Sequence, residues 1–377
     1  MDKENSPSRI QINRRDAIAL MAALVANVVG KGDSPASLDP LHQLQSSYKG
    51  KIDHVYMGTP RGSLCTESNS LANAILANGW DLTIVGSIEG IDKEVIDSEH
   101  TSVFPHWMSG EAFFPRDHLL LTEEGGTIVS RVPPTNDRYV NGIMKELIEG
   151  VSNRIRGPVY STPFPIVGGG ILKTDNEVLV SGEYKSLIGT LSKWFGYTSA
   201  VPVRKDGNLL AGGHIDLYVT PVAPNTLLVA DGRAGREIIS SLNNSEVDSY
   251  VQTVRSIDIM GDGRNDNFNL LNVREQVGWE SEMLDEIAHK LSKSYEVIRI
   301  PGVFDAKSRL MISYNNALVE HTPNSMTAIV PVTTIDELDD AAIDVYTKLS
   351  YKVTPVPFVG FSMHKAGIRC VTLESRV

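Results

Sequence analysis

One unit of secondary structure recurs along most of the chain: a short strand, a turn, a second strand and then a helix. Four turns are flanked on both sides by short apolar runs rich in β-forming residues, which is the pattern of a β-hairpin. These turns are 123–126, 174–177, 223–226 and 322–325. The first three are about fifty residues apart and the last gap is about twice as long, which is typical of an internal repeat. The recurrence predicts an α/β protein built from repeated ββαβ modules.

Helical patterns fill the intervals between the hairpins. The expected helices are 70–78, 139–152, 183–195, 280–294 and 334–349. The last one begins at Thr334, a good N-cap residue that is followed by acidic residues in the first turn. If such modules surround a pseudo-symmetry axis, their strand ends meet at the centre. A functional site is therefore expected there, formed by residues at equivalent places in successive modules.

The charge balance of the chain restricts its partners. Of 377 residues, 46 are acidic and 35 are basic, which gives a formal net charge of −11. Such a surface repels phosphate backbones, and no dense basic run overcomes the repulsion. Nucleic acid is not an expected partner, whereas a cationic small molecule or peptide would be attracted. The sequence does not indicate an oligomeric state.

The N-terminal region carries a separate signal. A pair of arginines, Arg14 and Arg15, precedes an apolar run over residues 17–30, which is too short to span a membrane comfortably. This pattern resembles a twin-arginine export signal, but it also fits a helix capped by Asn13 and packed on the core. Export and a cytoplasmic location both stay open. We expect residues 1–45 to form this segment and residues 46–377 to form a single domain that carries the site.

The chain has two cysteines, Cys65 and Cys370. Two cysteines make no disulfide framework, and their spacing is not that of a zinc site, so no metal is expected. One of them is free to act as a reagent, and Cys65 is expected to be a structural thiol. The acidic segment 256–269 misses the EF-hand spacing and is expected to be a solvated loop.

Three short segments place polar residues beside glycine or proline in apolar surroundings: residues 114–117 (FPRD), 212–216 (GGHID) and 366–372 (AGIRCVT). The first two precede hairpin strands, and the third lies on the last expected strand. In the second segment, the two-residue period of a strand would direct His214 and Asp216 to the same face. Together the segments offer a nucleophile, a base and two carboxylates.

These residue types suit the chemistry of a guanidinium group. A cysteine is nucleophilic as its thiolate, which a nearby protonated histidine stabilises. A guanidinium is planar, and two carboxylates can bind it bidentately and hold its carbon in front of the sulfur. Taken singly, each residue also fits a structural role, as a buried thiol, a core histidine or a capping aspartate. Only the combination indicates catalysis.

The order of the motifs, F-P-R-D, then G-H-I-D, then a C-terminal G-I-R-C-V-T, resembles the guanidino-group modifying enzymes of the pentein superfamily. This superfamily includes agmatine, arginine and peptidylarginine deiminases, dimethylarginine hydrolase and the amidinotransferases. The resemblance extends from about residue 54 to the end of the chain. It implies a five-bladed α/β propeller of ββαβ units around a pseudo-fivefold axis.

The resemblance also implies roles for four residues. Cys370 would be the nucleophile and His214 the general acid and base. Asp117 and Asp216 would hold the guanidinium nitrogens. No cofactor or metal is implied.

Two glycines complete the implied substrate site, Gly213 beside the histidine and Gly169 in the second module. One departure concerns Val167, which stands where arginine and agmatine deiminases have the glutamate of a Glu-Gly-Gly motif. Residues 282–304 are similar to peptidylarginine deiminases, which also rely on two aspartates, a histidine and a cysteine. Calcium dependence is left open.

The implied reaction is a two-step covalent hydrolysis of arginine, an arginine derivative or peptidyl-arginine, which yields a ureido group and ammonia. An amine in place of water would make the protein an amidinotransferase, and the ending 370–373 is similar to those enzymes. A non-catalytic binding protein with the same fold is a further alternative, because the glutamate is missing. A Cys-His protease is disfavoured, since no histidine follows Cys370. The candidates for the mouth of the site are His106, Trp107, Glu111 and Arg309.

Overall fold

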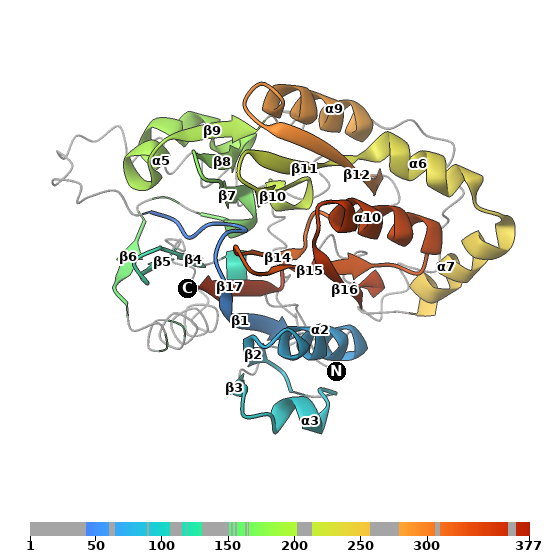
Figure 1. Cartoon of the computed structure of the whole chain (residues 1–377), viewed down its shortest axis with the longest axis horizontal. Coiled ribbons are helices and arrows are strands. Elements are labelled where there is room, and N and C mark those ends of the chain that lie inside the picture. Colours follow the sequence, from blue (N-terminus) through green and yellow to red (C-terminus); the bar gives the residue numbers. More distant parts are fainter. Residues whose placement is uncertain are drawn as a thin grey trace, which may run out of the picture.

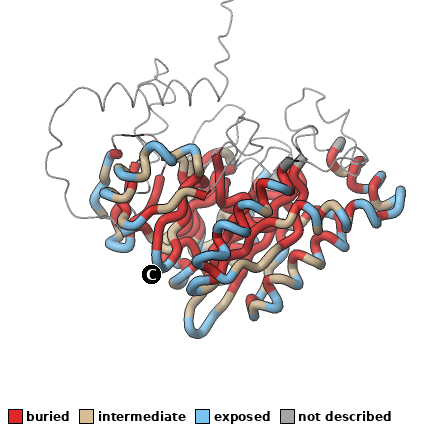
Figure 2. Tube along the Cα trace, turned by 90° about the horizontal axis from the view of Figure 1, so that it is seen from above, coloured by how far each residue is buried: buried red, intermediate tan, exposed pale blue. Residues whose placement is uncertain are grey.

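The computed structural model describes residues 43–59, 65–88, 90–105, 115–117, 119–129, 151, 154, 157–162, 164, 166–201, 213–256, 279–305, 310–360 and 367–377. Within these residues the strands form five separate sheets. Helices lie on the outside and the strands lie inside, where most of their residues are buried (Figures 1 and 2).

The first sheet joins the two ends of the described chain, because the last strand pairs with the first (Figure 1). Its order is β17 (Thr372–Arg376), β1 (Ile52–Thr59), β2 (Asp81–Gly86) and β3 (Thr101–Pro105). The second sheet contains β4 (Leu119–Leu121), β5 (Thr127–Val129) and β6 (Val159–Ser161). The third contains β7 (Ile171–Lys173), β8 (Val178–Ser181) and β9 (Thr198–Val201). The fourth contains β10 (Val219–Ala223), β11 (Thr226–Asp231), β12 (Glu296–Asp305) and β13 (Leu310–Ser313), and the fifth β14 (Leu318–His321), β15 (Met326–Val332) and β16 (Lys352–Pro357).

All five sheets repeat one pairing pattern. The first two strands are antiparallel, and the third runs parallel to the second. The four predicted hairpins are confirmed as β4–β5, β7–β8, β10–β11 and β14–β15. In the third hairpin, Asn225 has a φ of 58°, a left-handed conformation that asparagine tolerates better than most residues.

The helices lie between the second and third strands of their units. They are α2 (Cys65–Ala77), α3 (Lys93–Ile96), η3 (Gly182–Leu187), α5 (Ile188–Phe195), α6 (Gly232–Ser241), α7 (Asn244–Ser256), α9 (Trp279–Leu291) and α10 (Asp336–Lys348), with α3 following the first unit. The predicted helix 70–78 starts earlier, and the first half of 183–195 is a 3-10 helix. Helices α6 and α7 were not predicted, because their apolar positions are sparse.

The predicted N-cap of the last helix is wrong. The N-cap is Ile335, whose side chain makes no capping hydrogen bond. The Asp339 carboxylate, near the start of the helix, accepts the backbone N–H of Thr333, which precedes the helix, at 2.8 and 3.0 Å. This bond ties the segment before the helix to its first turn but does not cap the helix.

The largest hydrophobic cluster extends from the first sheet to the last turn of the chain. It contains Ile84 of β2, Leu217, Ile368 and Cys370, all of which are almost fully buried. The segment around Cys370 is therefore packed into the core.

Several predictions concern residues outside the described part of the chain. These are the N-terminal segment as far as residue 42, most of the helix at 139–152, the loop after Ser256, and the mouth candidates His106, Trp107, Glu111 and Arg309. Cys65 is the first residue of α2, and its side chain also lies outside the described part. Among the described helices, none is long and apolar enough to cross a lipid bilayer.

Candidate active site

The candidate residues lie in turns that immediately precede the first strand of each sheet. Asp117 ends η1 (Pro115–Asp117) before β4, and Gly169 lies in η2 (Gly168–Gly170) before β7. His214 and Asp216 lie at η4 (Ile215–Leu217) before β10. Cys370 lies in the turn before β17. These are equivalent places in four of the repeated units, as the sequence predicted.

Two details of the prediction are wrong. Cys370 is not on the last strand, since its backbone N–H closes a turn onto the Gly367 carbonyl at 3.1 Å. Asp216 is not on a strand either, because Gly213 has a φ of 86° and the chain then enters η4. Only a residue without a Cβ adopts that backbone conformation readily. Chain reversal, and not the two-residue period of a strand, therefore brings His214 and Asp216 together.

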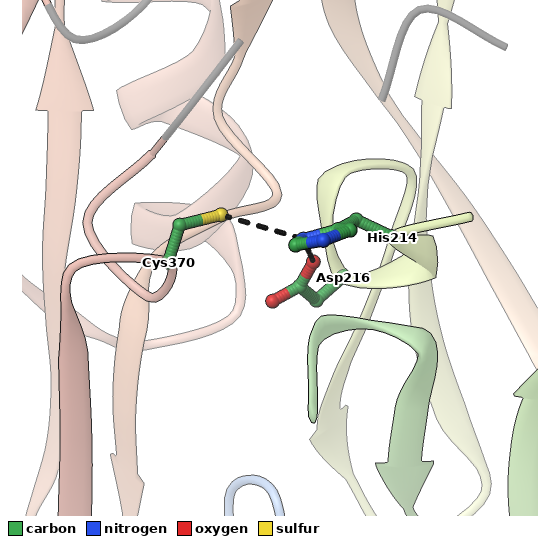
Figure 3. Close-up of side chains that lie close together, drawn as sticks. All are labelled: His214, Asp216 and Cys370. Atoms are coloured by element: carbon green, nitrogen blue, oxygen red, sulfur yellow. Dashed lines mark hydrogen bonds and ion pairs between the residues drawn. The ribbon is translucent and has the colours of Figure 1, made fainter. Parts of the chain in front are cut away.

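The imidazole of His214 is the centre of the constellation (Figure 3). Its Nδ1 atom lies 4.0 Å from the Cys370 Sγ atom and 4.0 Å from Oδ1 of Asp216. Its Nε2 atom lies 3.5 Å from Oδ1 of Asp117. The Nδ1 atom of this histidine thus faces the thiol and one carboxylate, and its Nε2 atom faces the second carboxylate.

The site lies deep in the protein. The side chains of His214 and Asp117 are 7% and 13% exposed, and Asp216 is fully buried. Burial raises the pKa of the Cys370 thiol well above its usual range, and the negative charges of Asp216 and Asp117 raise it further. In the protein alone, the thiol is therefore held in its protonated, weakly nucleophilic form. The expectation of a stabilised thiolate does not apply to this state.

The carboxylate of Asp216 is buried, and few local interactions stabilise its negative charge. Neither of its carboxylate oxygens has a hydrogen-bond partner among the described residues. Burial raises its pKa, while the positive charges of His214, Arg369 and Arg116 act in the opposite direction. A buried carboxylate without donors is costly, so the geometry favours a cationic ligand that supplies them.

The backbone of Gly169 lies close against the imidazole of His214. A Cβ atom at this position would lie 2.3 Å from His214 Nδ1 and 3.0 Å from Oδ1 of Asp216. At Gly213, a Cβ atom would lie 2.2 Å from a carboxylate oxygen of Glu183. The two glycines named from the sequence therefore allow the turns to approach closely. Whether either one contacts a substrate stays a prediction.

Asn316 was missed by the sequence analysis. It precedes β14, so the fifth unit also contributes to the site from the equivalent turn. Its Oδ1 atom accepts the Cys370 backbone N–H at 3.0 Å, and its Nδ2 atom donates to the Asp216 carbonyl at 3.4 Å. This fully buried amide links the two turns that carry the nucleophile and one carboxylate. Equivalent spacing within the repeat is the signal that could have found it.

Val167, where the resemblance places a missing glutamate, is the N-cap of η2. Its backbone N–H donates to the Tyr184 hydroxyl at 2.9 Å. The nearby Glu183 carboxylate lies on η3, beside Gly213. A further carboxylate is thus supplied beside Gly213, although not from the position of Val167.

The same donors could also bind a metal ion. Ligand atoms of His214, Asp216 and Cys370 all lie within 4.8 Å of one another, and this is the single such group within the described residues. One thiolate, one imidazole and one carboxylate suit a zinc ion. Such an ion would block the sulfur and the imidazole at once.

No protein-family model matches the sequence, and comparison with curated protein sequences finds no match. Comparison with solved structures does find similar folds. Agmatine deiminase from C. jejuni has a TM-score of 0.60 at 10% identity, covering 89% of this chain and 97% of that one. Agmatine deiminase of Enterococcus faecalis has a TM-score of 0.55 at 12% identity, covering 89% and 96%. A protein provisionally named a peptidyl-arginine deiminase has a TM-score of 0.58 at 14% identity, covering 91% and 100%.

The similarity extends over nearly the whole length of these proteins. At such low identity it concerns the fold, a mixed α/β architecture with several small sheets. The fold is therefore similar to that of solved structures named as agmatine deiminase and as a provisional peptidyl-arginine deiminase.

Proposed function

We propose that this chain, which has the fold of the agmatine deiminases, hydrolyses a guanidinium group with Cys370 as the nucleophile. The expected substrate is arginine, an arginine derivative or peptidyl-arginine. The expected products are a ureido compound and ammonia. Asp117, His214 and Asp216 act with Cys370.

The observation that carries this proposal is the position of a buried thiol among two carboxylates and one histidine. Nearby negative charge makes a thiol harder to ionise, so this arrangement is unfavourable for a neutral or anionic substrate. A planar cation reverses the effect, because it pairs with both carboxylates and adds positive charge beside the sulfur. The site is therefore suited to a substrate that brings its own positive charge.

In the first step, Asp117 and Asp216 bind the guanidinium nitrogens and place the carbon in front of the Cys370 sulfur. The thiol proton passes to His214, 4.0 Å away, as the cation lowers the pKa of the thiol. The sulfur forms a bond to the guanidinium carbon, and His214 donates the proton to the departing nitrogen. Ammonia leaves, and an amidino thioether remains on Cys370.

In the second step, water attacks the carbon of the thioether. His214 accepts one proton from the water, the carbon–sulfur bond breaks with its electron pair returning to Cys370, and the remaining hydroxyl proton passes to that sulfur and restores the thiol. His214 then releases its proton to the solvent, where ammonia takes it up as ammonium. The oxygen of the water becomes the carbonyl oxygen of the ureido product. One histidine serves both steps because it faces the sulfur and the carboxylates together.

We further propose that the five sheets are the blades of a single propeller formed by residues 46–377. Two observations support this arrangement. The strand pairing is the same in all five sheets, and β17 pairs with β1, so that the end of the chain completes the first unit. In such a propeller the five turns before the first strands would meet at the axis.

The experiment measures ureido product and ammonia from free arginine, agmatine, peptidyl-arginine and methylated arginines. Cys370→Ala is compared with Cys65→Ala, a matched control at the other cysteine. We expect turnover of at least one substrate, abolished only in Cys370→Ala. Turnover that survives in Cys370→Ala would refute the mechanism.

Added amines separate the alternatives. If a guanidino product forms only when an amine acceptor is present, the protein is an amidinotransferase. If no guanidine reacts with or without acceptors but one binds, the protein is a binding protein.

A further inference from the structure

Five turns precede the first strands of the five sheets, and each of them contacts the next. These are η1, η2, η4 and the turns before β14 and β17. A Cβ atom at Gly168 of η2 would lie 2.0 Å from the Arg116 carbonyl oxygen of η1, and η2 also lies against His214. Asn316 links the turns before β10 and β17. The remaining contact, from the turn before β17 back to η1, is made by the side chain of Arg116.

Arg116 makes this contact through two hydrogen bonds. Its Nε atom donates at 3.0 Å to the carbonyl of Arg369, the residue before Cys370. Its Nη2 atom donates to the carboxylate of Glu374 on β17. The side chain is 7% exposed, and a planar guanidinium holds its donors in a fixed relative geometry. One buried group therefore ties the segment that carries Cys370 to η1, in which Asp117 follows Arg116 directly.

Arg376 shares the carboxylate of Glu374 with Arg116 but does not make the same contact. Its Nη2 atom lies 3.4 Å from a carboxylate oxygen of Glu374, and its side chain is 3% exposed. Its other acceptors are four backbone carbonyl oxygens, those of Ser47, Tyr48, Gly50 and Val319. The two arginines are thus alike in residue type, burial and ionic partner. They differ in that Arg116 bonds a turn of the active site.

The positive charge of Arg116 also acts on the nucleophile. Burial raises the pKa of the Cys370 thiol, and the carboxylates of Asp216 and Asp117 raise it further. The turn hydrogen bond to Gly367 and the positive charge of Arg116 act in the opposite direction. The imidazole of the active-site histidine, 4.0 Å from the sulfur, is the other titratable group that faces the thiol among the described residues. Removal of the Arg116 charge should therefore make the thiol harder to ionise.

We propose that Arg116 is a positioning residue, which holds the turn of Cys370 at the separation from Asp117 that attack on a bound guanidinium requires. A lysine would keep the charge but lacks the planar fork that bonds both acceptors at once. This inference rests on the proposed function, because it gives Arg116 a task in that reaction. Its effect on the thiol can nevertheless be measured without turnover.

The test compares Arg116→Gln and Arg116→Lys with the matched controls Arg376→Gln and Arg376→Lys. The measurements are kcat and KM for the best guanidine substrate and thermal unfolding. We expect both Arg116 variants to lower kcat by about 10- to 100-fold, with a smaller effect on KM, because the sulfur moves relative to a substrate that both carboxylates still bind. The Arg376 variants should also lower the melting temperature, since they break a buried ion pair, but they should keep kcat.

The second readout is the rate of Cys370 alkylation by iodoacetamide as a function of pH. Arg116→Gln should shift this profile to higher pH and lower the rate at pH ~8 about threefold or more, because it removes a positive charge near the sulfur. Arg116→Lys should keep the profile of the wild type while its kcat stays low. That combination separates the position of the turn from the charge. Both Arg376 variants should follow the wild-type profile.

Equal losses of kcat in the Arg116 and Arg376 variants would overturn the proposal, because Arg116 would then have only a structural role. Wild-type kcat in Arg116→Lys would also overturn it, since a charge alone would suffice. If Arg116→Gln does not fold, the two lysine variants decide by their kcat values. If the wild type turns over no guanidine, the proposed function fails, but the alkylation profiles still decide whether Arg116 acts on Cys370. Coinciding profiles for the two glutamine variants would show that it does not.

Discussion

Replacement of Gly169 by alanine tests the packing of the active site most sharply. The new Cβ atom would lie 2.3 Å from His214 Nδ1 and 2.8 Å from its Cγ atom, whereas ordinary contacts begin at 3.4 Å. The imidazole must therefore move by about 1 Å, and a displacement of about 1 Å at a reacting group costs about 100-fold in rate. The extra methyl group in a buried position should also cost about 1–3 kcal/mol of stability.

The assay combines kcat for the best guanidine substrate with thermal unfolding. Gly189→Ala is the matched control, because a Cβ atom there meets nothing within 4 Å and the residue lies in α5. We expect the control to keep kcat and to gain up to about 1 kcal/mol of stability. A Gly169→Ala variant with wild-type kcat and wild-type stability would refute the geometry described for His214.

Three further results are expected. Asn316→Ala should lower kcat about tenfold or more and destabilise the fold by about 1–3 kcal/mol, because the Cys370 amide loses one of its two acceptors and the link to the Asp216 carbonyl is broken. Asn315→Ala, which breaks a bond to the Leu228 carbonyl instead, should destabilise the fold while keeping kcat. Burial and the adjacent carboxylates raise the pKa of Cys370, so the rate of its alkylation by iodoacetamide should still be rising above pH ~9. A cationic haloacetamidine should react faster than the neutral haloacetamide, and equal rates for the two reagents would argue against a site that binds cations. Zn²⁺ should inhibit turnover, and a chelator should reverse the inhibition, through His214, Asp216 and Cys370; full activity at saturating Zn²⁺ would contradict that arrangement.

The repeated hairpins were predictable because turn residues and β-forming runs are local signals. The turns at 174–177 and 223–226 mark both strands of their hairpins, and the pairing follows from adjacency. The pairing of β1 with β17 has no local signal, since the two strands lie at opposite ends of the chain. It follows only from the repeat taken as a whole.

The candidate site was predictable as a set of residues but not as a geometry. The order and combination of three short motifs identified Asp117, His214, Asp216 and Cys370. Their 3-10 turns were not predicted, because the motif residues alone do not indicate the positive φ that Gly213 adopts before η4.

Asn316 shows the same limit, because the repeat could indicate its position before a hairpin strand but not its contacts. Its role depends on two hydrogen bonds to segments distant in the sequence, at Asp216 and Cys370. The raised pKa of the thiol likewise depends on burial among groups from several modules.

The central claim is that Cys370 forms a bond to the guanidinium carbon, and mass spectrometry of the protein during turnover tests it directly. Acid quenching of the wild-type protein during turnover should trap the amidino adduct, because a protonated His214 cannot accept a proton from the attacking water. We expect a mass increase equal to the substrate minus ammonia, located on the peptide that contains Cys370. An adduct on another residue, or undiminished turnover in Cys370→Ala, would contradict the account.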